Sequence, residues 1–309
     1  MKDFRSIGEI LSFPRVSIVI PTYNRREDVV ECLRSIQKLD YPNYEIIVVD
    51  NGSTDGTGDA IERLFQEVKL IKSERNLGVT GGRNLGAKHS SGEYIFFLDH
   101  DTTVGRNTLN ELMSVMQSNH NIGIAGPAVY YYNDPKRVWG LGTSINMVTG
   151  RVSFNEAGKI DNGQFVKVID VQVLPTAFLV ESEVIDKVGL FDDIFFAVYE
   201  DTDFCFRVKE AGYKVICVTT AKVWHKVSLN EREQQLGVLR RAYYVARNRI
   251  IFMRKHAKPL NFFSFLIVSA PIFAFYYTLQ SSKYFDNSAT REYYKGLLDG
   301  LKVAFRQKD

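Results

Sequence analysis

The sequence predicts an α/β fold in which a mostly parallel β-sheet lies between layers of helices. Near the amino terminus, short apolar segments alternate with amphipathic ones, an order typical of a parallel sheet covered on both faces. These apolar segments also end in polar residues, where the ligands of open α/β sheets bind. The polar ends are 21–24, 50–53 and 99–101, with the sequences PTYN, DNGS and DHD. We therefore expect one ligand-binding cleft at this edge of the sheet.

The individual elements follow from local pattern. Apolar and β-branched runs predict strands at residues 16–21, 45–50, 68–72 and 93–98. The helix at 27–38 is predicted by the helical spacing of Val29, Val30, Leu33 and Ile36. Further helices are predicted around residues 60–65, at 78–90 after a glycine-rich turn, and at 201–211.

Composition limits the domain organisation and the partners. A chain of 309 residues with 45% hydrophobic content predicts a catalytic domain at 1–228 and a helical carboxy-terminal region at 229–309. The net charge of +3 does not favour nucleic-acid binding. Three scattered cysteines, Cys32, Cys205 and Cys217, do not suit a disulfide framework or a zinc site and indicate a reducing compartment. Residues 1–13 contain no apolar signal-peptide core.

Two carboxylates, Asp99 and Asp101, follow directly after the buried strand at 93–98. Carboxylate oxygens two positions apart can hold Mg²⁺ or Mn²⁺, and these ions usually bind substrate phosphates as well. For such a pair in isolation, a solvated Asp-x-Asp turn is the better explanation. The convergence of other polar strand ends favours the metal site.

A nucleotide fits the same edge of the sheet. Asp50 can accept a hydrogen bond from a base or ribose, Tyr23 can cover a ring, and Gly52 and Gly81 allow close backbone approach. The alternatives are an Asx turn or helix cap at Asp50 and a simple tight turn at Gly81. The glycines do not form a dinucleotide fingerprint, and the sequence contains no Walker A loop.

Several segments, in order and spacing, resemble family 2 of the inverting glycosyltransferases, which have the GT-A fold of nucleotide-diphospho-sugar transferases. They are VSIVIPTYNR, EIIVVDNGSTDGT, NLGVTGGRNLG, YIFFLDHDT, VYEDTDFCFRVKEAGYKV and AKVWH, and the resemblance covers residues 16–225. It implies a nucleoside diphosphate sugar as the donor and Mn²⁺ or Mg²⁺ as the cofactor.

The resemblance also implies roles for individual residues. Asp101 coordinates the metal, His225 completes the metal site, and Asp201 is the catalytic base. The predicted nucleotide-sugar site comprises Pro21, Thr22, Tyr23, Asp50, Asn51, Gly81, Arg83 and Asp99.

The chemistry of these residue types agrees with the resemblance. A single carboxylate opposite the leaving group gives one in-line displacement and inversion, and the dipole of the helix at 201–211 helps to keep Asp201 ionised. Acids in a first helical turn are also common caps, and Asp203 with Arg207 is predicted to form an ordinary helix pair. His225 is either a metal ligand or a satisfied, partly buried histidine.

The middle of the chain is predicted to cover the acceptor side of the cleft. Residues 138–173 contain polar turns between β-like runs, which predict a hairpin, and Trp139 either stacks on a sugar ring or packs in the core. Residues 175–180 resemble the family's segment next to the acceptor.

The carboxy-terminal region predicts attachment to a membrane surface. Residues 260–279 carry no charge and include Pro271, and both flanks are basic: 240–258 before, and then Lys283, Arg291, Lys295, Lys302, Arg306 and Lys308. A broken interfacial helix or a shallow re-entrant hairpin satisfies both flanks. The alternative is a soluble helical hairpin packed on the catalytic domain or on a dimer partner. The final helix, 289–305, is predicted to be an amphipathic surface helix.

Together these features predict a metal-dependent inverting glycosyltransferase on the cytoplasmic face of the cell membrane. Its expected acceptor is lipid-linked or a polysaccharide, in surface-glycan or glycoprotein assembly, and the resemblance favours a rhamnosyl or related hexosyl transferase. One alternative is a nucleotidyltransferase, whose basic glycine-rich loop the segment PTYNRRED does not supply. The other is a catalytically silent sugar-nucleotide-binding scaffold, against which Asp99, Asp101 and Asp201 together argue.

Overall fold

One sheet of ten strands organises the computed structural model, which describes residues 13–306. Its order is β10-β12-β6-β11-β4-β1-β2-β3, with β5 paired to β12 and β7 to β6. The strands are β1 (Val16–Thr22), β2 (Tyr44–Asp50), β3 (Lys69–Lys72), β4 (Tyr94–Leu98), β5 (Thr102–Val104), β6 (Ile122–Tyr131), β7 (Asp134–Gly140), β10 (Val168–Asp170), β11 (Ala177–Glu181) and β12 (Lys214–His225). Of the main path only β10 and β11 run against the other strands, so the predicted mostly parallel sheet is confirmed. Two of the sequence predictions fall partly outside the described residues: the prediction for residues 1–13, of which 1–12 are not described, and the basic flank at Lys308.

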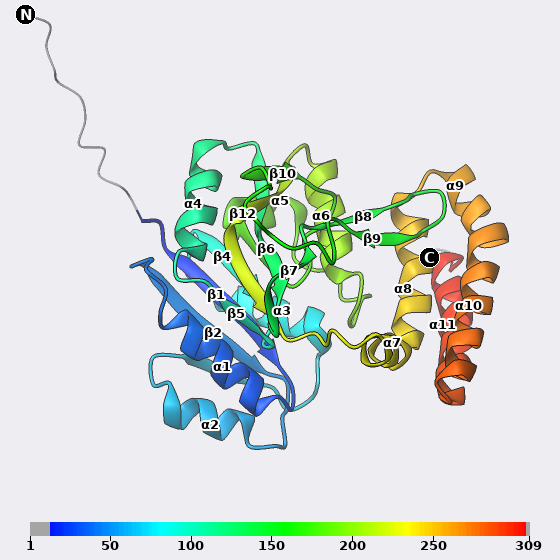
Figure 1. Ribbon diagram of the computed structural model, residues 1–309, viewed down its shortest axis with the longest axis horizontal. Coiled ribbons are helices and arrows are strands. Elements are labelled where there is room, and N and C mark those ends of the chain that lie inside the picture. The colour runs from blue at the N-terminus through cyan, green and yellow to red at the C-terminus, as the bar shows by residue number, and fades with distance from the viewer. Residues whose placement is uncertain (1–12, 307–309) are drawn as a thin grey trace, which may run out of the picture.

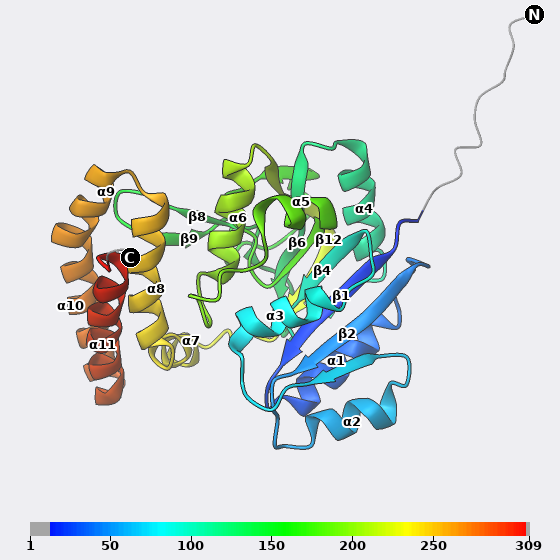
Figure 2. The same ribbon diagram turned by 180° about the vertical axis from the view of Figure 1, so that it is seen from behind.

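Helices cover both faces of this sheet, as the alternating pattern predicts (Figures 1 and 2). Helices α1 (Arg26–Ile36), α2 (Thr57–Leu64) and α4 (Thr108–Ser118) pack on one face. The other face is covered by α3 (Gly78–Lys88), α5 (Ser182–Val188) and α6 (Glu200–Glu210).

Strict alternation of buried side chains explains the two hydrophobic cores. In β1, Ile18 and Ile20 point into the core under α1, whereas Val19 points into the core on the opposite face. In β4, Phe96 and Phe97 divide in the same way and are fully buried. Burial of each of these large side chains stabilises the fold by roughly 1.5–3 kcal/mol.

The parallel register brings the polar strand ends together. Thr22 at the end of β1 pairs with Asp50 at the end of β2. The antiparallel strand β11 lies between β4 and β6, and the Asp99 N–H donates to the carbonyl of Thr176 just before β11. The predicted ligand-binding edge is therefore formed by β1, β2, β4 and the start of β11.

The region at 138–173 contains the predicted hairpin. Strands β8 (Thr143–Ile145) and β9 (Val152–Phe154) pair in a separate two-stranded sheet. Figures 1 and 2 show this hairpin extending toward the carboxy-terminal helices. At its tip, a side chain at Gly150 would come within 3.0 Å of Phe265.

The carboxy-terminal region consists of five helical segments. They are α7 (Glu231–Leu239), α8 (Ala242–His256), α9 (Pro259–Ser264), α10 (Ala270–Lys283) and α11 (Asn287–Ala304), with a π-helical turn at Phe265–Ser269 between α9 and α10. Gly296 and Gly300 of α11 have no Cβ, and this lets α11 approach the α8 backbone at Tyr243 and Arg247. The predicted boundary at residue 228 falls between β12 and α7. As a domain boundary it stays a prediction, because residues 250–253 of α8 share a hydrophobic core with the sheet.

The expected break at Pro271 does not occur. Proline removes one N–H and clashes with the carbonyl four residues earlier. The π-helical turn absorbs this conflict, since the Ala270 N–H donates five residues back to Phe265. Residues 259–283 therefore form one continuous helix.

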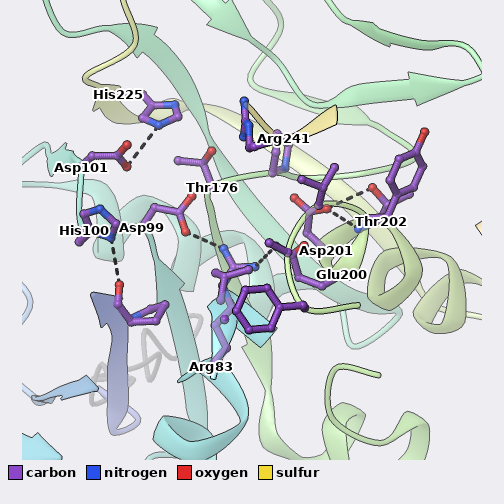
Figure 3. A pocket seen from close by; sticks show the side chains of 18 of the residues that line it. Arg83, Asp99, His100, Asp101, Thr176, Glu200, Asp201, Thr202, His225 and Arg241 are labelled. Carbon is purple, nitrogen blue, oxygen red and sulfur yellow. Dashed lines mark hydrogen bonds and ion pairs between the residues drawn. The ribbon is translucent and has the colours of Figure 1, made fainter. Parts of the chain in front are cut away.

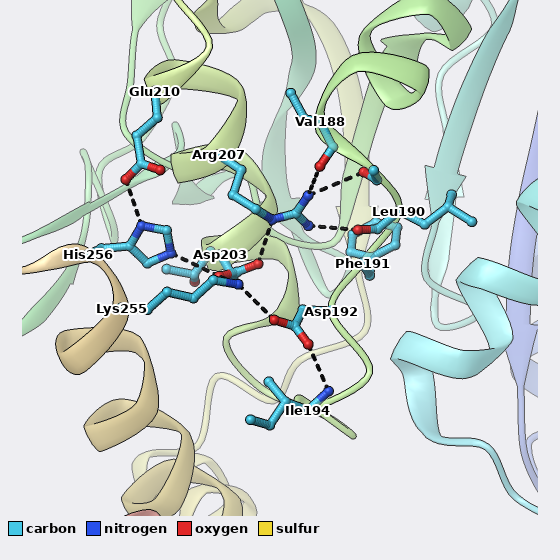
Figure 4. A network of polar contacts seen from close by, with 12 residues as sticks. Val188, Leu190, Phe191, Asp192, Ile194, Asp203, Arg207, Glu210, Lys255 and His256 are labelled. Carbon is cyan, nitrogen blue, oxygen red and sulfur yellow. Dashed lines mark hydrogen bonds and ion pairs between the residues drawn. The ribbon is translucent and has the colours of Figure 1, made fainter. Parts of the chain in front are cut away.

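Asp203 anchors α8 to α6 through a buried polar network (Figure 4). Its carboxylate is fully buried and lies 2.8 Å from each of three basic groups, Arg207 Nε, Lys255 Nζ and His256 Nε2. Burial alone would raise the pKa of Asp203, but the hydrogen bonds from His256, Lys255 and Arg207 lower it to about 2. The predicted pair with Arg207 is thus part of a larger network that joins distant segments.

We predict that Asp203→Asn destabilises the fold at neutral pH. Removing one partner of a buried ion pair typically costs about 3–5 kcal/mol, because the remaining charges lose their compensation. Urea unfolding at pH 7 measures this loss. Asp40→Asn is the control, because Asp40 pairs with Arg106 at the surface, where such pairs contribute about 0–1 kcal/mol.

The pH dependence has a definite sign. The folded-state pKa of Asp203 lies below its unfolded value, so its stabilisation is present above pH ~4 and is lost as the pH falls toward 2. The stability difference between wild type and Asp203→Asn should shrink over that range. Equal stabilities at pH 7 would show that the network contributes nothing.

Candidate active site

A cleft of about 650 Å³ lies at the carboxyl ends of the strands (Figure 3). Its wall comes from the β1, β2 and β4 ends, the hairpin β8–β9, the loop before α6, and α7 and α8. Of the residues predicted for the site, the following line it: Pro21, Thr22, Tyr23, Asn51, Arg83, Asp99, Asp101, Asp201 and His225.

Asp50 and Gly81 lie behind this wall and do not line the cleft. The Asp50 carboxylate is buried and accepts the N–H of Ser53, three residues on, at 2.9 Å, so it caps the turn that follows β2. Gly81 faces Leu77. The glycines that allow close approach are Gly78, which lines the cleft at φ 71°, and Gly82, whose added Cβ would lie 2.8 Å from Pro21.

The end of β1 and the β2 turn form one side of the cleft. Tyr23 is 43% exposed, which leaves its ring free to cover a ligand. Thr22 and Asn51 are buried beside it, and Asn51 Nδ2 donates to the carbonyl of Gly78 at 3.1 Å. His100 closes this side, with Nδ1 lying 3.1 Å from the carbonyl oxygen of Pro21.

Arg83 joins two acidic groups beneath the cleft. It is 1% exposed, and its guanidinium donates to Asp99 at 2.7 Å and to Glu200 at 3.2 Å. Phe178 and Phe191 pack against the guanidinium at 5.8 and 5.4 Å. Burial opposes the charged form, but the two carboxylates outweigh it, so the pKa of Arg83 is raised.

Asp101 and His225 lie in contact with each other on one wall of the cleft. His225 Nε2 lies 3.3 Å from Asp101 Oδ1 (Figure 3), and the ring of Trp139 packs edge-on to the imidazole at 4.9 Å. Burial would raise the pKa of Asp101, but the charge and hydrogen bond of His225 lower it well below its usual range. Trp139 therefore lies in the cleft wall, next to the predicted metal ligands.

Glu200 and Asp201 form the acidic end of the cleft at the start of α6. Burial, reinforced by the charge of Asp201, raises the pKa of Glu200 to about 8. Burial also raises the pKa of Asp201, although Arg83 and the hydrogen bonds from Thr202 oppose this. Both acids at the start of α6 therefore hold a proton more tightly than exposed carboxylates do, a property that suits a group that exchanges protons.

Strained backbone surrounds these acids. Thr176, Val198 and Tyr199 line the cleft with positive φ angles of 72°, 68° and 76°. Such conformations cost about 1–3 kcal/mol each and persist where the surrounding structure over-determines them, often at functional sites. Local sequence gives no signal for them, since none of the three is a glycine.

Unpaired polar atoms concentrate on the same wall. Among the described residues, buried side-chain atoms without a hydrogen-bond partner are Thr22 Oγ1, Asn51 Oδ1, Arg83 Nε, Glu200 Oε2, His225 Nδ1 and Arg249 Nη1. All but Arg249 belong to residues that line the cleft. Buried polar groups are normally paired, so this concentration indicates a site built for a polar ligand.

Sequence reasoning missed the part of the wall that comes from the carboxy-terminal region. Gln234 and Val238 of α7, Val245 of α8, and Arg241 just before α8 line the cleft opposite the strand ends. Arg241 is exposed and lies above Asp201 in Figure 3. Arg241 belongs to the basic stretch at 240–258, whose charge pattern by itself predicts a membrane flank and not a cleft wall.

The comparisons with known proteins identify a family for this chain. Residues 17–181, more than half of the chain, match the family described as Glycosyl transferase family 2. The dTDP-rhamnosyl transferase RfbF of Shigella flexneri is 28% identical over 261 residues, covering 78% of this chain and 81% of RfbF. Glycosyltransferase GlyG of Streptococcus pneumoniae serotype 4 is 27% identical over 176 residues, and the match spans only 58% of GlyG.

A solved structure shows the same fold. The mannosyltransferase PcManGT from Pyrobaculum calidifontis, in complex with GDP-Man and Mn²⁺, aligns with a TM-score of 0.60 at 16% identity, covering 99% of this chain and 92% of PcManGT. The family resemblance and the GT-A fold predicted from the sequence are thereby confirmed.

Proposed function

We propose that this chain, which belongs to glycosyl transferase family 2, moves a sugar from a nucleoside diphosphate sugar to an acceptor hydroxyl with inversion at the anomeric carbon. The observation that carries the proposal is the cleft wall itself. It combines unpaired buried polar atoms, the Asp101 and His225 pair, and a carboxylate at the opposite end. PcManGT holds GDP-Man and Mn²⁺ in the same fold, and RfbF is a dTDP-rhamnosyl transferase.

The residues present fit a divalent cation that is shared with the donor. Within residues 13–306, no group of three or more His, Cys, Asp or Glu side chains could hold a metal by itself. Asp101 and His225 supply two ligands, and Mg²⁺ typically takes its remaining ligands from substrate phosphates and water. When bound, Mn²⁺ or Mg²⁺ supplies positive charge to the diphosphate leaving group.

The donor would lie against the strand ends. Tyr23 covers the base, Thr22 and Asn51 offer their unpaired oxygens to the nucleoside, and Arg83 holds Asp99 in place beneath it. Asp50 and Gly81 are also predicted to contact the nucleotide sugar. Because neither residue lines the cleft, a ligand would have to reach behind the cleft wall to touch them, and their contact with it stays a prediction.

Asp201 would act as the general base. Its half-buried carboxylate has a raised pKa and lies across the cleft from the Asp101 and His225 pair. A base with a pKa nearer neutrality takes up the proton of an attacking hydroxyl more readily. Trp139 and Phe154 present aromatic rings 4.6 Å apart on the same wall, which suits the face of an acceptor sugar.

Metal-dependent donor binding tests the role of Asp101. We expect Asp101→Ala to abolish the stabilisation that Mn²⁺ adds to donor binding, since the ion would lose one of its two protein ligands. Thermal shift with dTDP-rhamnose, UDP-GlcNAc and GDP-mannose, each with and without Mn²⁺, measures this. Unchanged metal-dependent shifts in the variant would rule out Asp101 as a ligand.

Sugar transfer tests the role of Asp201. Asp201→Asn keeps the size of the side chain but cannot take a proton, so we expect kcat to fall by about 10²- to 10⁴-fold with little change in donor affinity. In wild type, activity should fall at acid pH as Asp201 becomes protonated, with a midpoint above the ordinary Asp pKa because burial raises it. Near-normal turnover by Asp201→Asn would leave Glu200 as the next candidate.

We further propose that the helix at 259–283 lies on the cytoplasmic face of a membrane. It is the one described helix long and apolar enough to cross a bilayer. However, α11 packs along it and carries Lys295, Asp299 and Lys302, and a spanning orientation would draw these charges into lipid. Its outer side exposes apolar side chains at helical spacing: Leu260 (81%), Ile267 (75%), Ile272 (61%), Phe275 (65%) and Leu279 (52%). An in-plane orientation places this face in the bilayer interface.

Liposome flotation tests this surface. Replacing Leu260, Ile267 and Phe275 together by serine should abolish binding to anionic vesicles without lowering the melting temperature, because all three are exposed. Val166→Ser is the control, because Val166 is 68% exposed outside these helices. Wild-type protein that ignores the vesicles would favour packing of the helix against another protein. Protease cleavage beyond Lys283 in sealed right-side-out vesicles would instead show that the helix spans the membrane.

A further inference from the structure

Asn248 of α8 holds the loop that leads into Asp201. Its side chain is fully buried, and its Nδ2 group donates to two consecutive carbonyl oxygens, those of Ala197 and Val198, both at 2.8 Å. These carbonyls belong to the loop that lines the cleft immediately before Glu200 and Asp201.

The residues on either side of Asn248 contact the same loop. Arg247 Nη1 donates to the Asn248 side-chain oxygen and to the carbonyl of Ile194, both at 2.7 Å. The first of these bonds fixes the amide so that its N–H groups point at the loop. Arg249 Nε donates to the Tyr199 hydroxyl at 3.0 Å. Three consecutive residues of α8 are therefore engaged with one short loop.

The loop needs such support because its backbone is strained. Val198 and Tyr199 both have positive φ, which for a β-branched or bulky side chain is an outlier conformation. The opposite side of the loop is held by α3, where the Thr80 hydroxyl donates to the carbonyl of Phe195. The bend that delivers Asp201 to the cleft is thus clamped between α3 and α8.

We propose that Asn248 is a positioning residue for sugar transfer, which fixes the bend at 197–199 and thereby the place of Asp201 in the cleft. It acts through the loop and does not line the cleft itself. The expected effect of Asn248 on sugar transfer rests on the proposed function. It gives the carboxy-terminal helices a role in the reaction that is separate from membrane attachment.

Kinetics provide the first test. Asn248→Leu keeps the number and branching of the side-chain heavy atoms but removes both N–H donors, so kcat should fall by about 10²-fold, the cost of misplacing a reacting group by about 1 Å. Donor affinity, measured by thermal shift with the donor and Mn²⁺, should stay the same, because the strand ends are untouched. Arg247→Met, at a half-buried position, is a milder second variant that frees the amide and should lower kcat in the same direction.

Ile250→Ala is the matched control. Ile250 is a buried residue on the same helix that faces Gly300 of α11. It should lower the melting temperature and leave kcat near wild type. If Asn248→Leu and Ile250→Ala lose kcat equally for equal losses of melting temperature, Asn248 is only a packing residue and the proposal fails.

A second test does not depend on activity. Glycine adopts positive φ without steric cost, so Val198→Gly removes strain that Asn248 otherwise offsets. Asn248→Leu should therefore lower the melting temperature less in the Val198→Gly background than in wild type. Additive losses would overturn the proposal. If wild-type protein transfers no sugar, the proposed function fails, and this thermal coupling alone decides whether Asn248 holds the bend.

Discussion

The buried guanidinium of Arg83 is the interaction on which the site depends. A cation that is 1% exposed needs partners close by: Asp99 provides a carboxylate at 2.7 Å, and Glu200 accepts a second hydrogen bond from the guanidinium at 3.2 Å. Asp99 follows β4 and Glu200 opens α6, so one side chain fixes the spacing between the strand ends and the acids across the cleft. Arg83 reaches this position because α3 packs directly on β1 and β2, and the absence of a side chain at Gly82 and Gly86 permits that contact.

The acids at the start of α6 show how one helical turn serves three purposes. Residues on a helix point about 100° apart, so Glu200, Asp201 and Asp203 face different surroundings. Glu200 turns inward to Arg83 and holds a proton up to a pKa of about 8. Asp201 faces the cleft, and Asp203 ties α6 to α8 through Lys255 and His256. A cluster that looks like an ordinary acidic helix start in the sequence therefore places one acid against Arg83, one in the cleft and one in the network that joins α6 to α8.

Local pattern was sufficient for the elements whose burial repeats at a fixed period. The strands β1, β2 and β4 and the helices α1 and α11 appear close to their predicted bounds, because alternation and helical spacing record which face is buried. The pattern could not show that β11 lies between β4 and β6, since that pairing joins residues about eighty positions apart. The pattern also could not show that Asn51 lines the cleft whereas its neighbour Asp50 lies behind the cleft wall. The sequence also did not predict the π-helical turn before Pro271. A proline inside a helix normally predicts a break, and the sequence does not show that the backbone just before it can adjust to keep the helix continuous.

The basic stretch at 240–258 shows why charge alone misassigns a role. Seven Lys or Arg residues without an acid next to an apolar segment indicate membrane attraction, yet several of them contact the cleft, the loop before α6 or Asp203. Arg241 lines the cleft, Arg247 and Arg249 contact the loop before α6, and Lys255 joins the Asp203 network. Helix α8 thus has the cleft on one side and α11 on the other. The apolar outer face of 259–283 and the acids at the start of α6 are held in a fixed relation by this one helix, so attachment of that face to a membrane would also set the orientation of the cleft.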